Sequence, residues 1–232
     1  MQLTTRDAAR LLGVSDSTLH RWLKSGELPA TRVNDSYRLN RIDLLEFAAA
    51  RNLPISADLL AELETEAHAL PSLADAVRAG GVHRGISGTD KSSTLREVVE
   101  RLPLPRPADR ELLHRVLLAR EALGSTGLGD GIAIPHARNP IVLRIPRPEV
   151  AICYLDRPVD FGAIDGKPVH TLVTIVTPST RVHLHLLALV AAALHDVSVR
   201  SKLEARAGAE ELVPEIARVE AAIAARRGGG ER

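Results

Sequence analysis

Residues 118–138 read LAREALGSTGLGDGIAIPHAR, and this stretch decides how the larger part of the chain is interpreted. Its glycines mark a turn that leads into the apolar residues Ile132–Ile134, followed by Pro135 and His136. Proline fixes φ and glycine permits unusual backbone paths, so the imidazole of His136 is predicted to be held rigidly at the surface. An exposed, neutral imidazole is a nucleophile that can accept and return a phosphoryl group near pH 7. Residue type alone, however, favours a structural histidine.

Strand-like and helix-like patterns alternate around this stretch. Val150–Leu155 and Val169–Val176 are short β-rich runs bounded by proline and glycine, and Leu184–Leu194 is a strongly apolar helix. Further helices are predicted over residues 95–102, 109–123, 198–205 and 209–225, and a loop rich in small polar residues over 80–93. Strands alternating with helices predict an α/β domain.

The first 52 residues carry a different pattern of short helices and turns. The predicted elements are a helix capped by Thr4 or Thr5 and ended by Gly13, a helix over Asp16–Lys24 capped by Ser15, a hairpin of Thr31–Val33 and Tyr37–Leu39 with its turn at Asn34 and Asp35, and a third helix capped by Asn40. Helix, tight turn, helix and small wing form a DNA-reading geometry in which the second helix enters the major groove.

Polar side chains project from the second helix and the wing at positions that suit DNA contacts. Arginine can grip a guanine edge through two hydrogen bonds, and serine, threonine and lysine can hold phosphates or base edges. The candidate DNA-binding residues are Ser17, Thr18, Arg21, Lys24, Arg32 and Arg38. Residues 1–52 hold eight basic and six acidic side chains, so one copy is predicted to bind weakly, and a homodimer or a longer operator is expected. The alternative is a helical module that contacts protein.

Three segments of this region carry a family resemblance. LTTRDAARLLGVS at residues 3–15, TLHRWLKSGELP at 18–29 and YRLNRIDLL at 37–45 resemble the excisionase/MerR-type winged helix-turn-helix family. The resemblance implies double-stranded DNA as a partner. Within the module, Trp22 is predicted to lie in the core and His20 to be solvated.

Composition excludes several classes of protein. Aromatic residues make up 2% of the chain, which argues against binding single-stranded nucleic acid by base stacking. The single cysteine, Cys153, excludes an internal disulfide and a cysteine-rich zinc site, and it is predicted to be a buried strand residue. Residues 1–14 lack a signal-peptide pattern, and no apolar run approaches the roughly 18 residues of a membrane helix. A cytoplasmic location is therefore expected, with no membrane partner and no cofactor.

The histidine stretch carries a second resemblance. Residues 118–138, with PVDFGAIDGKPV at 158–169 and HLHLLALV at 183–190, resemble the type-2 enzyme IIA domains of the phosphoenolpyruvate-dependent sugar phosphotransferase system. The mannitol, fructose and nitrogen-related proteins make up this class. The resemblance runs from about residue 72 to 226. It implies an α/β fold with a mixed sheet and flanking helices, and a transient phosphohistidine instead of a turnover enzyme.

The resemblance also implies roles for individual residues. His136 would accept a phosphoryl group from a phosphocarrier protein of the HPr type, His183 would bond to that group or orient His136, and Arg120 would clamp its charge. Thr126 and Arg138 are expected as further phosphate-binding residues. A metal site at His183 and its neighbour His185 is disfavoured, because no further ligand lies at suitable spacing.

The predicted organisation is a winged helix-turn-helix domain at 1–54, a connector helix at 55–71 and a phosphotransferase domain at 72–226. The connector, with its apolar face, would transmit a signal or form a dimer interface. The leading hypothesis is a transcriptional regulator in which phosphorylation of His136 controls DNA binding. The alternatives are a nitrogen-type regulator that acts through protein contacts, and a component of sugar transport.

Overall fold

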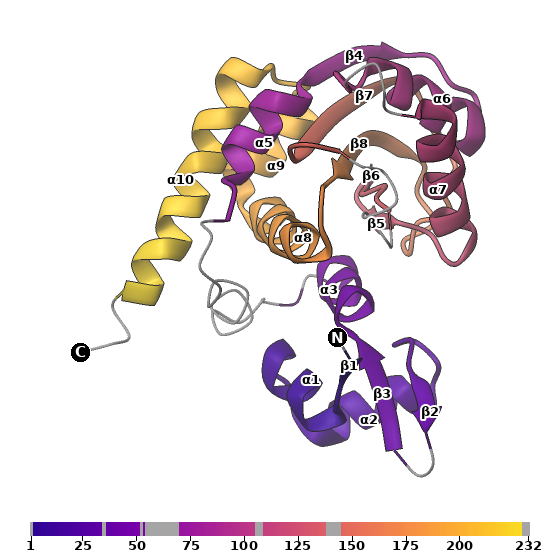
Figure 1. Ribbon diagram of the computed structural model, residues 1–232, viewed down its shortest axis with the longest axis vertical. Coiled ribbons are helices and arrows are strands. Elements are labelled where there is room, and N and C mark those ends of the chain that lie inside the picture. The colour runs from indigo at the N-terminus through magenta and orange to yellow at the C-terminus, as the bar shows by residue number, and fades with distance from the viewer. Residues whose placement is uncertain are drawn as a thin grey trace.

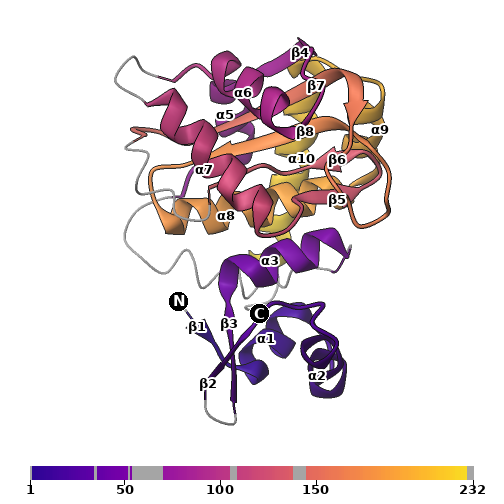
Figure 2. The same ribbon diagram turned by 90° about the vertical axis from the view of Figure 1, so that its right-hand side faces the viewer.

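The computed structural model describes residues 2–33, 36–51, 53, 70–104, 109–137 and 145–228. These residues form a small N-terminal domain and a larger C-terminal α/β domain (Figure 1). One helix of the N-terminal domain, α3, lies against the C-terminal domain in both views (Figures 1 and 2).

The N-terminal domain follows the predicted order of two helices, a hairpin and a third helix, preceded by a short strand that was not predicted. Its elements are β1 (Gln2–Leu3), α1 (Thr5–Leu12), α2 (Asp16–Lys24), β2 (Thr31–Val33), β3 (Ser36–Asn40) and α3 (Arg41–Ala50). The strands pair antiparallel in the order β1-β3-β2. The turn predicted at Asn34 and Asp35 lies outside the described residues.

Local sequence signals explain where these helices begin and end. Thr4 and Ser15 each accept a hydrogen bond from the backbone N–H three residues further on, and Asn40 accepts one from two residues on. Each such cap typically contributes about 1 kcal/mol. Gly13 ends α1 at a φ of 63°, in the left-handed region that glycine enters without steric cost.

The C-terminal domain holds a five-stranded mixed sheet and six helices among its described residues. Its elements are α5 (Leu73–Gly80), β4 (Val82–Ile86), α6 (Lys91–Arg101), α7 (Arg110–Ala122), β5 (Gly127–Gly129), β6 (Ile132–Ala133), β7 (Glu149–Val159), β8 (Val169–Val176), α8 (Thr180–His195), α9 (Val197–Glu204) and α10 (Ala209–Gly228). The strand order is β4-β7-β8-β6-β5. The β4–β7 and β6–β8 pairs are parallel, and the other two pairs are antiparallel.

The sheet is buried on both faces, and this explains the continuous apolar run of its central strand. Along β7, Val150 and Ile152 pack on the face with α5, α8, α9 and α10, while Ala151 and Cys153 pack on the face with α6 and α7. Side chains alternate between faces along a strand, so a strand covered on both sides must be apolar at every position. Cys153 is buried as predicted, and burial raises the pKa of its thiol to about 12.

The structure differs from expectation between residues 70 and 93. The predicted loop over 80–93 is wrong, because Val82–Ile86 forms β4 at the edge of the sheet, beside β7. The short helix α5, which precedes it, was not predicted. Most of the connector helix predicted for 55–71 lies outside the described residues.

Within the described residues, no single helix is long and apolar enough to cross a membrane. Only α8 and α9 taken together meet that length and composition, and they meet at an angle of 84°.

Glu220 ties the last helix to the start of the first helix of this domain. Its carboxylate accepts hydrogen bonds from Ser72 Oγ at 2.9 Å and from the backbone N–H groups of Leu73 and Ala74 at 2.6 and 3.0 Å. A helix N-terminus leaves N–H groups unpaired and carries partial positive charge. The carboxylate of Glu220 accepts hydrogen bonds from these N–H groups and places a negative charge beside them. It lies 146 to 148 residues away along the chain from the groups that it binds.

We predict that Glu220→Ala lowers the free energy of unfolding of the C-terminal domain by about 2 kcal/mol, because hydrogen bonds to a charged group are lost. The thermal midpoint should fall by roughly 4–8 °C in calorimetry. The matched control is Glu211→Ala on the same helix, which removes only an exposed ion pair to Lys202 and should leave the midpoint nearly unchanged. Equal midpoints for the two variants would contradict the prediction.

Candidate functional site

The β5–β6 hairpin positions His136. Its turn contains Asp130 and Gly131 with φ values of 50° and 72°, the pair of left-handed residues typical of a tight hairpin turn. After β6 the chain runs beside β8, where the N–H of Ile175 donates to the Pro135 carbonyl at 3.0 Å. His136 itself forms an isolated parallel bridge with Ile175. The backbone of His136 is therefore fixed against the centre of the sheet.

Both ring nitrogens of His136 have close partners. Nδ1 lies 2.7 Å from the carbonyl oxygen of Ile134, and Nε2 lies 2.5 Å from Oε1 of Glu46. Glu46 belongs to α3, so this contact joins the N-terminal domain to the C-terminal domain. The imidazole is only 1% exposed. The prediction of a surface histidine is therefore wrong, because the other domain covers the ring.

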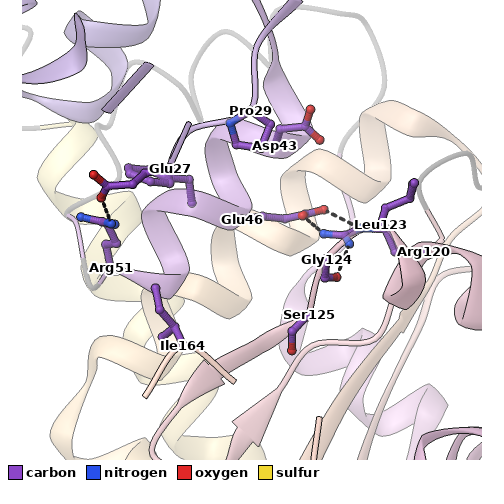
Figure 3. A pocket seen from close by; sticks show the side chains of 11 residues that line it. Glu27, Pro29, Asp43, Glu46, Arg51, Arg120, Leu123, Gly124, Ser125 and Ile164 are labelled. Atoms are coloured by element: carbon purple, nitrogen blue, oxygen red, sulfur yellow. Dashed lines mark hydrogen bonds and ion pairs between the residues drawn. The ribbon is translucent and has the colours of Figure 1, made fainter. Parts of the chain in front are cut away.

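Arg120, near the end of α7, completes the contact. Its Nε donates to Oε1 of Glu46 at 3.2 Å and its Nη2 donates to Oε2, so the guanidinium grips the carboxylate with two hydrogen bonds. Its Nη1 donates to the Gly124 carbonyl at 2.9 Å. Figure 3 shows Arg120 and Glu46 pointing toward each other from the two domains. Paired guanidinium–carboxylate bonds of this kind are among the stronger polar contacts in proteins.

The first turns of α8 bring His183 beside His136. The two ring centroids are 5.1 Å apart with an angle of 32° between the planes. His183 is fully buried, and neither ring nitrogen has a hydrogen-bond partner among the residues that the structure describes. Burial, and then the neighbouring His136 and Arg120, hold the pKa of His183 well below its ordinary value, so the ring is neutral. It can therefore offer a lone pair or an N–H to a group bound at His136.

The remaining predicted site residues lie in different surroundings. Thr126 is buried, and its Oγ1 and N–H both donate to Oε2 of Glu121, at 2.7 and 3.0 Å. His185 points elsewhere, as predicted, with Nε2 3.1 Å from the Pro71 carbonyl oxygen. Arg138 lies outside the described residues. No cluster of three potential metal ligands occurs in the described parts of the chain.

The geometry of the contact assigns the hydrogen on the His136 ring. The Ile134 carbonyl can only accept, so Nδ1 carries the hydrogen and Nε2 has the lone pair. Burial, and next the positive charge of Arg120, lower the pKa of His136 in this position to about 4, so the ring is neutral at pH 7. The 2.5 Å contact with Oε1 of Glu46 therefore covers the lone pair of Nε2.

A cavity of about 490 Å³ opens beside this contact, between the domains (Figure 3). The N-terminal domain lines it with Glu27, Pro29, Asp43, Glu46, Phe47 and Arg51, and the C-terminal domain with Arg120, Leu123, Gly124, Ser125 and Ile164. Solvent in the cavity reaches the edge of the Glu46–Arg120 pair, whereas His136 lies behind that pair and does not line it.

The candidate DNA-binding residues lie away from this interface. The second helix of the helix-turn-helix, α2, and the β2–β3 hairpin are on the side of the N-terminal domain that faces away from the C-terminal domain (Figure 2). Ser17, Arg21, Lys24 and Arg32 are exposed, and Thr18 and Arg38 are half-buried. Trp22 is buried against Phe47 and His20 is exposed, as predicted.

Comparison with known families agrees with this two-part structure. Residues 77–218 match the family model described as phosphoenolpyruvate-dependent sugar phosphotransferase system, EIIA 2. The chain belongs to this type-2 EIIA family. Residues 3–52 match a helix-turn-helix domain model. Both resemblances drawn from the sequence are confirmed, as is the mixed α/β fold.

Relatives of the EIIA domain include nitrogen regulatory proteins. The one from Pseudomonas aeruginosa is 39% identical over 130 residues, 55% of this chain and 82% of that protein. The one from Klebsiella oxytoca is 38% identical over 104 residues, 44% of this chain and 63% of that protein. The crystal structure of nitrogen regulatory protein IIA-Ntr from Neisseria meningitidis aligns with a TM-score of 0.51 and 30% identity, covering 63% of this chain and 95% of that one.

Glu46 is the site residue that sequence reasoning missed. Only the capping residue Asn40 and the helix-turn-helix motif at residues 37–45 drew attention to this helix. The sequence did contain one signal, because the apolar residues Leu44, Leu45, Phe47 and Ala48 surround a single acidic residue. All four apolar side chains are buried in the structure. A helix that is apolar on more than one side must be covered on more than one side. This indicated that α3 packs on a second body, and Glu46 would then lie at that junction.

We define the closed form as the arrangement in which Glu46 contacts His136, and the open form as the one in which α3 has left the EIIA domain. Burial first, and then Arg120, lower the pKa of His136 in the closed form, while the hydrogen bond to the Ile134 carbonyl and the charges of Glu121 and Asp43 raise it.

Proposed function

We propose that this chain is a transcriptional regulator whose DNA binding responds to phosphorylation of His136. The observation that supports this most is the direct contact of His136 with Glu46 on α3, a helix of the helix-turn-helix domain. The phosphoryl-accepting residue and the DNA-binding domain thus share one interface. A change of charge at His136 acts on the DNA-binding domain without any intermediate element.

The residues around His136 suit the transfer of a phosphoryl group. Nε2 is the nitrogen that attacks phosphorus, because Nδ1 is bonded to the Ile134 carbonyl. The N–P bond to His136 forms as the phosphorus–nitrogen bond of a donor phosphohistidine breaks, and that electron pair returns to the donor imidazole. Arg120 then binds phosphoryl oxygens, and the unpartnered ring of His183 bonds to another. Thr126 and Arg138 are proposed as further oxygen ligands.

A phosphocarrier protein of the HPr type is the proposed donor, and double-stranded DNA is the proposed target, in the cytoplasm. The exposure of Arg21, Lys24 and Arg32 supports the DNA-binding role, since a module used only as a tether would not need these basic side chains in contact with solvent. We also propose a homodimer, because the small excess of basic charge in residues 1–52 favours two copies on one operator.

A second function is favoured by the names of the relatives. Because the matched proteins from Pseudomonas aeruginosa and Klebsiella oxytoca are nitrogen regulatory proteins, the EIIA domain here can be a phosphorylation-dependent regulator that binds other proteins. In that case the helix-turn-helix domain would serve as a tether and would show no affinity for DNA. A role in sugar transport is the third alternative.

We predict that phosphoenolpyruvate, enzyme I and the phosphocarrier label the wild-type chain, and that His136→Ala is not labelled because its side chain offers no nitrogen. A mobility shift on a double-stranded fragment, selected from a random library, should differ between the labelled and unlabelled wild-type chain. The same reagents should leave the shift of His136→Ala unchanged. Labelling without any DNA shift would favour the protein-binding alternative.

We further predict that Arg21→Ala weakens binding to the selected fragment by about 5- to 150-fold, the loss that removal of one base-reading arginine produces. Arg115→Ala is the matched control, because Arg115 is an exposed arginine on α7 of the EIIA domain. It removes the same charge and should change the affinity little. Equal losses for both variants would mean that the chain binds DNA through overall charge and not through α2.

A further inference from the structure

We propose that the carboxylate of Glu46 occupies the position that a phosphoryl group on His136 would take. Docking of α3 onto the EIIA domain and phosphorylation of His136 then exclude each other. The inference rests on the proposed function of His136 and adds the way in which that site is controlled. In the closed form the DNA-binding domain is an internal ligand of the phosphoryl site, and it competes there with the phosphocarrier.

The contacts of Glu46 are those that a phosphoryl group on His136 requires. Its Oε1 lies 2.5 Å from Nε2, in the direction along which a bond to phosphorus would form. Arg120 binds both carboxylate oxygens through Nε and Nη2, as a guanidinium binds two oxygens of a phosphoryl group. The single side chain of Glu46 therefore contacts both the nitrogen of His136 that would attack phosphorus and the guanidinium of Arg120 that would bind the phosphoryl oxygens.

The Glu46 contact also blocks the chemistry of transfer. The lone pair of Nε2 faces Oε1 of Glu46 at 2.5 Å, so no phosphorus atom can approach it in the closed form. When α3 leaves, Glu46 departs with it, which uncovers a neutral imidazole with its hydrogen on Nδ1. Only then can Nε2 form its bond to phosphorus.

Access of a donor is blocked by the same contact. His136 is 1% exposed, and the side chains of Arg120 and Glu46 are only 10% and 18% exposed. A phosphohistidine carried on another protein has to bring its phosphorus against Nε2, and α3 lies between them. The face of the EIIA domain that α3 covers is thus the face that the phosphocarrier must reach.

Docking of α3 opposes phosphorylation, and the added charge of a phosphoryl group in turn opposes docking. Three carboxylates act on the imidazole, and two of them, Glu46 and Asp43, belong to α3, while the third, Glu121, belongs to α7. A phosphoryl group brings about −1.5 to −2 charges to Nε2. In the closed form it would face all three carboxylates, with Arg120 already paired. Opening removes two of the three and frees the guanidinium, so phosphorylation stabilises the open form.

Phosphorylation rates of the full-length chain test this, in the absence of DNA. Two donors are used, the phosphocarrier and the small donor phosphoramidate, which needs no protein docking. Glu46→Ala is expected to accept the phosphoryl group at least tenfold faster than wild type from the phosphocarrier. It should also be faster with phosphoramidate, because the carboxyl group of Glu46 no longer covers Nε2. Asp43→Asn should give a smaller increase in the same direction.

Glu27→Gln is the matched control, since Glu27 lies in the same domain and pairs with Arg51 of that domain, without touching His136. It should react at the wild-type rate. Solution scattering should show expansion of the wild-type chain on phosphorylation, and Glu46→Ala should be expanded before it. Equal rates for wild type and Glu46→Ala with both donors would overturn the inference alone. Failure of every variant to accept a phosphoryl group from either donor would overturn the proposed function itself.

Discussion

The shared carboxylate of Glu46, held between the imidazole of His136 and the guanidinium of Arg120, is the interaction on which the arrangement of the whole chain depends. Without it, a buried arginine would lack its counter-charge and a buried imidazole nitrogen would lack a partner, and both conditions are costly in a protein interior. The N-terminal domain meets both needs with a single side chain. The relative position of the two domains is therefore fixed by the needs of the phosphoryl site, and the apolar contact of α3 with α8 reinforces it.

The fold of the EIIA domain explains why this site is so sensitive to what covers it. A sheet buried on both faces sets His136 beside the central strand β8, and the start of α8 places His183 next to it, fully buried and with no hydrogen-bond partner among the described residues. An unpaired polar group in the interior usually costs about 1–3 kcal/mol of stability. A bound phosphoryl group would give the ring of His183 a partner. If His136 is phosphorylated as proposed, the modification would thus relieve an unfavourable feature of the domain.

The parts predicted from sequence are those governed by neighbours along the chain. Thr4, Ser15 and Asn40 cap helices through bonds to residues two or three positions away, so the order of elements in the N-terminal domain could be read directly. The motif around His136 likewise pointed to the candidate site and to the EIIA family. Strand β4 and the contact of Glu46 were not predicted, because each depends on residues that are distant in the sequence. The strand β4 contains histidine, arginine and glycine at its centre, and it is a strand only because β7 pairs with it. Nothing near Glu46 in the sequence identifies its partner, because His136 lies 90 residues further along the chain.

A carboxylate is suited to a contact between domains that has to be reversible. Glu46 is tethered, so its local concentration at Arg120 is on the order of millimolar or more, which lets a modest contact hold the closed form. Two unit charges about 5 Å apart, at an effective dielectric constant of 20, interact with roughly 3 kcal/mol. A phosphoryl group of nearly two charges facing Glu46 alone would therefore oppose closure by about 5 kcal/mol, close to the roughly 5.5 kcal/mol that reverses a two-state equilibrium from 1:99 to 99:1. An apolar side chain over His136 would seal the ring equally well, but it would be far less sensitive to the added charge. In the proposed switch, the acidic residue is what would let a covalent change at one nitrogen atom decide the position of a whole domain.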